Sequence, residues 1–247
     1  MLACNRMNIG RRRGRLKLSL VIPAYNESSI IEATLRTVTA RLADMDPDYE
    51  LLIVDDGSTD NMADLVRSFA DSHVRLTGYH PNGGKGKAVR VGMLEAKGDY
   101  VFCTDADLAY GLENIPPMLD KLAAGADLCI GSRRLDKLGY QGYPPIRLLT
   151  SKVFGVLVRL FSGLPYDTQC GIKGYRHDAA QAIFSRCSTD GFAFDFEVLL
   201  RARKLGLKVE QEAVHVVNHR ESKVNILRDS ARMFRDIFRI RRLVGRS

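Results

Sequence analysis

Two carboxylates separated by a single residue carry the clearest chemistry in this sequence. Asp105 and Asp107 follow the apolar run Tyr100-Val101-Phe102-Cys103, which is typical of a buried β-strand. Carboxylate oxygens suit a hard cation such as Mg²⁺ or Mn²⁺, which keeps its other coordination positions for water and phosphate. An isolated pair of this kind is more often part of a surface turn. Its position at a strand end favours a metal and diphosphate site.

Polar residues also follow two earlier strand-like segments. The first ends in Pro23-Ala24-Tyr25-Asn26-Glu27 and the second in Asp55-Asp56-Gly57-Ser58-Thr59-Asp60. Ligands of open α/β sheets bind beyond the carboxyl ends of the strands, so these segments should converge with the carboxylate pair. Residues 58–60 can cap the next helix. Asp55 and Asp56 then remain free to accept hydrogen bonds from a nucleobase or ribose.

A glycine-rich segment is a candidate phosphate cradle. Asn82-Gly83-Gly84-Lys85-Gly86-Lys87-Ala88 offers backbone N–H groups and the start of a helix, both of which bind anions. It has neither the spacing of a Walker loop nor a G-x-G-x-x-G fingerprint. ATPase and NAD-enzyme interpretations therefore lose support.

Short apolar runs alternate with longer helical patterns over the first two-thirds of the chain, which predicts βαβ units and a mostly parallel sheet. The alternation then lapses into a loop rich in glycine, tyrosine and proline at 139–145. The predicted strands are 17–23, 49–55, 74–79, 99–104, 127–131 and 208–217. The predicted helices are 28–42, 60–70, 87–96, 113–123, 146–161, 194–205 and 224–244.

Composition indicates one α/β catalytic domain, because 247 residues with 45% hydrophobic content can bury one substantial core. Five scattered cysteines argue against a disulfide framework or a zinc site and favour a cytoplasmic protein. No stretch approaches the roughly 20 apolar residues of a membrane span. The net charge of +8 favours an anionic partner, which leaves nucleic acid, an acidic membrane surface and phosphorylated substrates open.

The ordered motifs together resemble inverting glycosyltransferase family 2 with the GT-A fold. They are the segments that end the first two strands, the glycine-rich segment and Asp105-Ala106-Asp107. Downstream, Gly131-Ser132-Arg133, Asp167-Thr168-Gln169-Cys170-Gly171-Ile172-Lys173, Phe192-Ala193-Phe194-Asp195-Phe196-Glu197 and Ser222-Lys223 are similar to the dolichyl-phosphate glucosyltransferases and their mannosyl relatives. The resemblance implies a catalytic domain at 17–223. The arginine-rich start of the chain predicts a basic extension at 1–16, and helical spacing predicts an amphipathic C-terminal helix at 224–247. A nucleotide-binding half would cover 17–135 and an acceptor-side half 136–223.

The resemblance also implies a role for individual residues. Nucleotide-sugar binding would involve Pro23, Ala24, Tyr25, Glu27, Asp55, Asp56, Lys85, Asp105, Ala106 and Asp107. Asp105 and Asp107 would hold Mg²⁺ or Mn²⁺, and the catalytic residues would be Asp107, Arg133, Lys223 and Asp195. The acceptor and phosphate groups would meet Arg133, Asp167, Gln169 and Lys223. The downstream resemblance implies UDP-glucose as donor, with GDP-mannose as the alternative. The mannosyl relatives often carry glutamine where this chain has Ala109, which weakens the mannose interpretation and leaves metal ligation partly open.

The acceptor is either a polyprenyl phosphate or a carbohydrate hydroxyl. A lipid phosphate is already ionised near neutral pH, whereas a hydroxyl needs a general base. Asp195 or Glu197 can supply that base in a relative with a hydroxyl acceptor. The alternative is a structural role, because acidic residues in the first turn of a helix interact favourably with its dipole.

Arginines accompany apolar residues at helical spacing near the C-terminus. Phe234 and Phe238 recur beside Arg235, Arg239 and Arg242, which fits a helix on an anionic membrane surface or one packed on the core. A peripheral enzyme on the cytoplasmic face of a membrane is the expectation. A nucleic-acid-binding module is a rival, but it leaves the strand-end aspartates unexplained. A degenerate nucleotide binder is a second rival.

Overall fold

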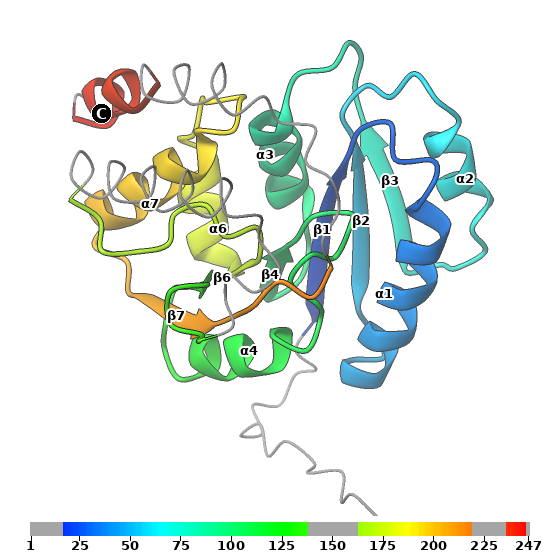
Figure 1. Ribbon diagram of the computed structural model, residues 1–247, viewed down its shortest axis with the longest axis horizontal. Helices are drawn as coiled ribbons and strands as arrows, with labels where there is room; N and C mark the ends of the chain where they lie inside the picture. The colour runs from blue at the N-terminus through cyan, green and yellow to red at the C-terminus, as the bar shows by residue number, and fades with distance from the viewer. Residues whose placement is uncertain (1–16, 138–162, 219–235, 246–247) are drawn as a thin grey trace, which may run out of the picture.

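The computed structural model describes residues 17–137, 163–218 and 236–245. Its strands form one seven-stranded sheet in the order β3-β2-β1-β4-β6-β5-β7 (Figure 1). The strands are β1 (Leu18–Ala24), β2 (Glu50–Asp55), β3 (Val74–Gly78), β4 (Tyr100–Cys103), β5 (Leu128–Ser132), β6 (Lys173–Arg176) and β7 (Val209–Ala213). The helices are α1 (Ile31–Met45), α2 (Met62–Ser68), α3 (Lys85–Glu95), α4 (Ile115–Ala123), α6 (His177–Phe184) and α7 (Phe194–Lys204), followed by a helix over 236–245.

The predicted, mostly parallel α/β sheet is confirmed. β1 pairs in parallel with β2 and β4, β2 with β3, and β5 with β7. The exception is β6, which is antiparallel to both of its neighbours, β4 and β5. The basic extension 1–16, the loop 139–145 and the predicted helix 146–161 lie outside the described residues.

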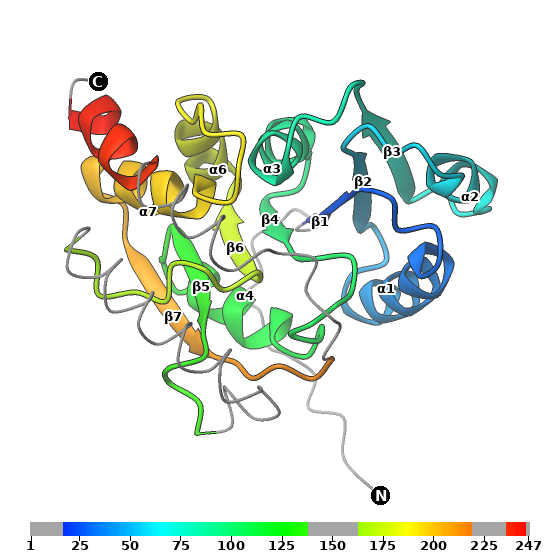
Figure 2. The same ribbon diagram turned by 45° about the horizontal axis from the view of Figure 1, so that its top comes forward.

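Helices cover both faces of the sheet, as the nearly continuous burial of β1 and β2 requires. Leu20 and Ile22 of β1 pack in one hydrophobic cluster with α1, α2 and α4, whereas Val21 packs in the other with α3, α6 and α7. Figure 2 shows these two groups on opposite sides of the sheet, with the 236–245 helix beside α7. Within the described part of the chain, no helix combines the length and apolar character that crossing a bilayer requires.

The antiparallel strand β6 determines which residues meet at the carboxyl edge of the sheet. Its first residue, Lys173, lies opposite Cys103 at the end of β4 and opposite Ile130 of β5. Because β6 runs the other way, the residues just before it lie where the parallel strands end. The segment from Asp167 to Ile172 therefore joins the edge that holds the strand-end aspartates.

The sequence patterns did not predict β6 or α6. β6 has only four residues, which include a lysine and a glycine, and α6 follows it without a loop. The start of α2 was predicted better. Asn61 occupies its N-cap position, but Asp60, one of the predicted capping residues, accepts the N–H of Met62 at 3.1 Å.

Candidate active site

The loops that follow β1 and β2 form one hydrogen-bonded unit. Asn26 has a φ of 53°, a left-handed conformation that asparagine tolerates better than most residues. Its Oδ1 accepts the N–H of Thr59 at 2.8 Å, and its own N–H donates to Oγ of Ser58 at 3.0 Å. The N–H of Ser28 donates to Asp60 at 3.0 Å. Asn26 was not a predicted site residue, yet it joins the two predicted polar segments.

The predicted nucleotide-binding residues of β1 and β2 lie along this unit. Pro23 and Ala24 are the last residues of β1, and Ala24 is buried. Tyr25 is 43% exposed, so its ring is accessible from solvent directly after the end of β1. Asp55 is largely buried, and its Oδ1 accepts the N–H of Ser58 at 2.8 Å. Glu27 is half-buried, and its carbonyl oxygen accepts the first N–H groups at the start of α1.

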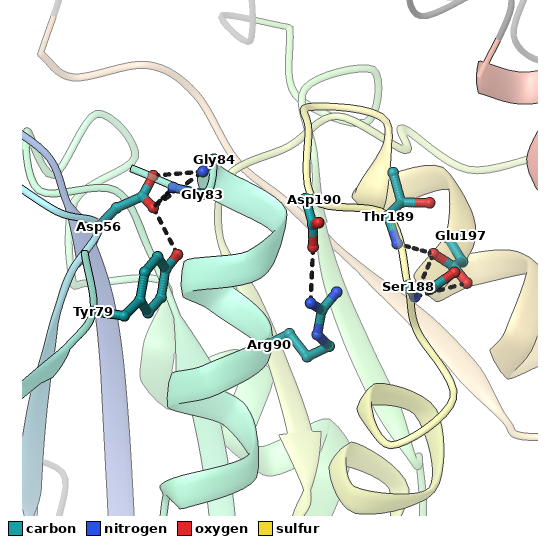
Figure 3. Close-up of polar contacts among 9 residues, drawn as sticks. All are labelled: Asp56, Tyr79, Gly83, Gly84, Arg90, Ser188, Thr189, Asp190 and Glu197. Carbon is teal, nitrogen blue, oxygen red and sulfur yellow. Dashed lines mark hydrogen bonds and ion pairs between the residues drawn. The ribbon is translucent and has the colours of Figure 1, made fainter. Parts of the chain in front are cut away.

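Asp56 does not match the expectation that its carboxylate is free. Its oxygens accept the hydroxyl of Tyr79 at 2.6 Å and the N–H groups of Gly83 and Gly84 at 2.8 and 3.0 Å (Figure 3). They also accept Nδ2 of Asn82 at 3.0 Å. Burial and the Asp56 charge raise the pKa of Tyr79, which keeps its hydroxyl protonated as a donor. Asp56 therefore holds the glycine-rich segment in place, and donors of its own chain occupy its oxygens.

The predicted phosphate cradle is also occupied from within the chain. The carbonyl oxygen of Asp190 accepts the N–H of Gly86 at 2.8 Å and that of Lys87 at 3.4 Å. With Gly83 and Gly84 bound to Asp56, four backbone donors of the segment already have partners. The prediction that these N–H groups cradle a phosphate is therefore wrong in this structure.

Lys85, in contrast, points its ammonium at the carboxylate pair. Its Nζ lies 2.5 Å from Oδ1 of Asp105. Burial acts to lower the pKa of Lys85, but the charges of Asp105 and Asp195 raise it, so the lysine is a cation at neutral pH. Burial, and then the charge of Asp105, raise the pKa of Asp107. The buried Ala106 between the two aspartates accepts a 2.7 Å hydrogen bond from Thr34 through its carbonyl oxygen.

The two aspartates fit a cation that is shared with a substrate. Among the described residues, no three Cys, His, Asp or Glu side chains cluster in a way that would enclose a metal ion. Burial, and then the charge of Asp105, raise the pKa of Asp107, so positive charge nearby would compensate its ionised form. A divalent cation that completes its coordination with phosphate oxygens and water would supply that compensation.

Arg133 and Asp167 form a two-point ion pair between the end of β5 and the segment before β6. Nε and Nη2 of Arg133 lie 2.8 and 2.7 Å from the two carboxylate oxygens. Burial acts to raise the pKa of Asp167, but the hydrogen bonds and charge of Arg133 lower it. Gln169 is half-buried in the turn that follows. The predicted acceptor residues 133, 167 and 169 are therefore brought together.

Lys173 is a buried cation that sequence reasoning did not assign. Its Nζ lies 2.6 Å from Oδ1 of Asp195 and also donates to the carbonyl oxygen of Cys170. Lys173 is 1% exposed and Asp195 9%. Burial raises the pKa of Asp195, while Lys173 and Lys85 oppose that shift. The one signal for this role in the sequence is a lysine at the first position of the unpredicted strand β6.

Glu197 is fully buried and saturated with donors. Its carboxylate accepts the N–H groups of Ser188 at 3.0 Å and Thr189 at 2.8 Å (Figure 3). It also accepts Nε and Nη2 of Arg201 at 2.9 and 2.7 Å. Burial acts to raise the pKa of Glu197, but the hydrogen bonds from Thr189, Ser188 and Arg201 lower it. A carboxylate in this state cannot serve as the base that one reading of the sequence allowed.

The chain returns to the carboxylate pair after β7. The N–H of Val217 donates to the carbonyl oxygen of Ala109 at 2.8 Å, and Nδ2 of Asn218 donates to that of Asp107 at 2.8 Å. Asn218 was not predicted to belong to the site. Lys223 lies outside the described residues, five positions further along the chain.

Comparisons with known proteins agree with this geometry. The sequence model described as "Glycosyl transferase family 2" matches residues 19–184. Dolichyl-phosphate beta-glucosyltransferase of Dictyostelium discoideum is 32% identical, covering 91% of this chain and 73% of that protein. Glycosyltransferase AglD of Haloferax volcanii is 30% identical, covering 91% of this chain and 37% of that protein. The fold is shared with glucosyl-3-phosphoglycerate synthase from Mycobacterium tuberculosis, solved with Mn²⁺, UDP-glucose and phosphoglyceric acid, at a TM-score of 0.68, 21% identity, and 93% and 80% coverage.

Proposed function

Because the chain belongs to glycosyl transferase family 2, we propose that it transfers glucose from UDP-glucose to a polyprenyl phosphate. The relative from Dictyostelium, which this chain matches over most of both lengths, is a dolichyl-phosphate glucosyltransferase by name. The solved structure that shares the fold contains UDP-glucose. These two findings support the acceptor and the donor, respectively. Transfer from GDP-mannose is the alternative donor reaction.

The donor binds along the edge formed by the ends of β1, β2 and β4 in this proposal. Tyr25 and Asp55 meet the nucleoside, and Asp105 and Asp107 hold Mg²⁺ or Mn²⁺ against the diphosphate. The bound cation supplies positive charge that stabilises the leaving diphosphate. Lys85, which lies 2.5 Å from Asp105, adds a fixed positive charge at the same place. The Mn²⁺ in the structure that shares the fold supports this assignment.

The environments of the two candidate bases, Asp195 and Glu197, support the acceptor class. The observation that carries it is the 2.6 Å contact between Asp195 and the buried ammonium of Lys173. The raised pKa of Asp195 would strengthen it as a base, but the residue is only 9% exposed and one oxygen is committed to Lys173. A phosphate acceptor needs no base, because it is already ionised near neutral pH. A carbohydrate hydroxyl with Asp195 as base is the second candidate.

In the proposed transfer an oxygen of the acceptor phosphate attacks the anomeric carbon of glucose. The bond from that carbon to the UDP oxygen breaks, and UDP leaves with the bonding electrons and with inversion at the carbon. Arg133, Asp167 and Gln169 form the acceptor side, with Arg133 held in place by Asp167. Lys223 is a further proposed phosphate ligand, since five residues span at most about 17 Å from Asn218, which is bonded to Asp107.

The helix over 236–245 is the proposed contact with an anionic membrane surface. Ile237, Ile240 and Val244 are buried in the core, and Lys204 of α7 donates to the carbonyl oxygen of Val244 at 2.6 Å. The outward face carries Phe238 and Leu243, which are 53% and 40% exposed, together with the exposed residues Arg239, Arg241 and Arg242. Apolar and basic side chains on one face suit the boundary of an anionic bilayer.

The decisive experiment measures transfer of radiolabelled sugar into a butanol-extractable polyprenyl phosphate. UDP-glucose and GDP-mannose are supplied separately, each with and without Mg²⁺ or Mn²⁺. Label in the organic phase from UDP-glucose, lost on chelation, is the expected result. Label in the organic phase from GDP-mannose alone would mean that GDP-mannose, and not UDP-glucose, is the donor. Label in a water-soluble glycan, with none in lipid, would replace the acceptor and restore Asp195 as the candidate base.

A further inference from the structure

We propose that Glu197 is a positioning residue for Lys85, acting through residues 188–190 and the first turn of α3. The role of Lys85 at the diphosphate rests on the proposed function. The mechanical linkage from Glu197 to Lys85 does not, because it consists of hydrogen bonds within the chain. Figure 3 shows Glu197 on α7 with its bonds to Ser188 and Thr189, Asp190 beside α3, and Asp56 with Gly83 and Gly84.

The first step is the fixing of the 188–190 loop by Glu197. Two consecutive N–H groups, those of Ser188 and Thr189, donate to its carboxylate, and Arg201 holds the carboxylate from one turn further along α7. Glu197 is 0% exposed and Thr189 2%, so the bond between them is removed from water. A charged acceptor that is removed from water makes stronger hydrogen bonds than a neutral one. The loop therefore has a fixed backbone.

The second step passes from the loop to α3. The carbonyl oxygen of Asp190 accepts the N–H groups of Gly86 and Lys87, which begin the helix and have no partner within it. The approach is close enough to require glycine. A Cβ on Gly86 would lie 2.4 Å from the carbonyl oxygen of Thr189, and one on Gly84 would lie 2.7 Å from that of Asp190.

The third step is that Lys85 lies between two such clamps. On its N-terminal side Asp56 binds the N–H groups of Gly83 and Gly84, and on its C-terminal side Asp190 binds that of Gly86. The Lys85 backbone is thus fixed by residues that follow β2 and by residues that precede α7. Its ammonium is 27% exposed and lies 2.5 Å from Asp105. Fixing the backbone on both sides places a flexible side chain where the proposed diphosphate binds.

The test compares Glu197→Gln with a matched buried glutamate. Glu50 is 3% exposed, accepts the N–H of Lys97 and Oγ of Ser19, and pairs with Arg75. It begins β2, at the opposite end of the strands from the site. Glu50→Gln therefore removes a comparable buried charge without touching the linkage.

The kinetic readout is the kcat of glucosyl transfer in a double-mutant cycle that combines Glu197→Gln with Lys85→Met. Glu197→Gln is expected to lower kcat about tenfold or more, since small displacements of a charged group in an active site have effects of this size. The Glu50→Gln control should remain within about twofold of wild type. In the Lys85→Met background, Glu197→Gln should cost less than about twofold, because residues that act through one another are non-additive. If the two substitutions lower kcat by factors that multiply in the double variant, the proposal is overturned.

The second readout is amide hydrogen exchange, which needs no activity. Exchange at Gly86 and Lys87 should accelerate in Glu197→Gln but not in Glu50→Gln, and unchanged exchange there would also overturn the proposal. If wild type transfers no sugar to lipid phosphate, the proposed function fails while this readout still decides the linkage. If Glu197→Gln does not fold, Gly86→Ala replaces it, because its Cβ pushes on the carbonyl oxygen of Thr189. The same non-additivity with Lys85→Met is then expected.

Discussion

Lys173 and Asp195 form a buried ion pair with a separation of 2.6 Å, which connects the start of β6 to the first turn of α7. Neither side chain is appreciably exposed. Removing one partner of such a pair leaves an uncompensated charge away from water, which is more costly than the pair itself is stabilising. The pair thus makes Asp195 a structural acceptor first, and any chemistry it performs must be compatible with that bond.

Asp195→Asn tests whether this carboxylate is a general base. We expect transfer to polyprenyl phosphate to fall by less than about tenfold, because loss of a true base costs roughly 10²- to 10⁴-fold. Thermal stability should fall, by roughly 3 kcal/mol, because Lys173 loses its partner. Lys173→Gln is the matched control, since it breaks the same pair but keeps the carboxylate. Loss of activity in the asparagine variant alone, at a temperature where both are folded, would make Asp195 the base.

Asp107→Ala should reduce transfer at least about 100-fold, because a bound cation contributes several kcal/mol to stabilising the leaving group. The fold should survive, since removing this carboxylate also relieves its repulsion with Asp105. Turnover and melting temperature are measured beside Asp44→Ala, which changes an exposed aspartate on α1. Chelation should abolish wild-type activity, and added Mn²⁺ or Mg²⁺ should restore it. Wild-type turnover in Asp107→Ala would remove this residue from the metal site.

Gly171→Ala should lower activity about tenfold or more with little change in stability. A Cβ at this position would lie 2.5 Å from Oδ2 of Asp105, so the carboxylate must shift, and such shifts are costly in active sites. Gly191→Ala is the matched control, because its Cβ would meet no atom within 4 Å. Both are assayed for kcat and for the Mn²⁺ concentration that gives half-maximal activity. Equal activity of the two variants would contradict the close approach.

Stability should fall in acid through buried glutamates such as Glu50. Burial acts to raise its pKa, but hydrogen bonds from Ser19 and Lys97, and then Arg75, lower it. Because the pKa of Glu50 is lower in the folded protein, ionised Glu50 contributes its full stabilisation at pH values above the pKa of the unfolded chain, near 4.3. That stabilisation is lost as pH falls through the pKa of the folded protein. Urea unfolding from pH 6 to pH 3 should therefore be less pH-dependent in Glu50→Gln than in wild type. An identical dependence of the unfolding free energy on pH in the two proteins would show that Glu50 does not contribute to the acid sensitivity.

Replacing Arg241 and Arg242 with glutamine should weaken binding to anionic vesicles by roughly tenfold or more, since each basic residue near such a surface contributes about 1 kcal/mol. The effect should shrink as salt rises. A charge-matched control changes Arg36 and Arg67, which are exposed on α1 and α2, across the sheet from the 236–245 helix. Co-sedimentation with vesicles measures both. Equal losses would indicate that net charge, and no particular face, governs binding.

The sequence predicted most of the parallel part of the sheet, because its strands are apolar and its helices have clear periodicity. It did not predict β6, whose four residues carry no such pattern. This strand can be recognised only from its neighbours, since it fills the place between β4 and β5. The position of Lys173 in the site depends on that placement and was missed with it.

Site residues were easier to identify than their contacts. Asp56 and Lys85 belong to motifs that are visible in the sequence, but spacing cannot say that Asp56 binds Gly83 and Gly84. Likewise, the motif containing Glu197 was visible, whereas its contacts with Ser188 and Thr189 depend on how α7 packs. Local pattern indicates which side chains can do chemistry, and tertiary packing determines which of them are already occupied.

The strand order also constrains when the molecule can be completed during synthesis. Among the strands that the structure describes, β5 pairs only with β6 and β7, both of which are translated after it. A ribosome-bound chain that ends near residue 137 can assemble the sheet from β3 to β4, but β5 then has no neighbour with which to pair. Long-range pairing of this kind is formed late, after its loop-closure entropy has been paid. The sheet edge that holds the candidate site is therefore assembled only once β6 has emerged.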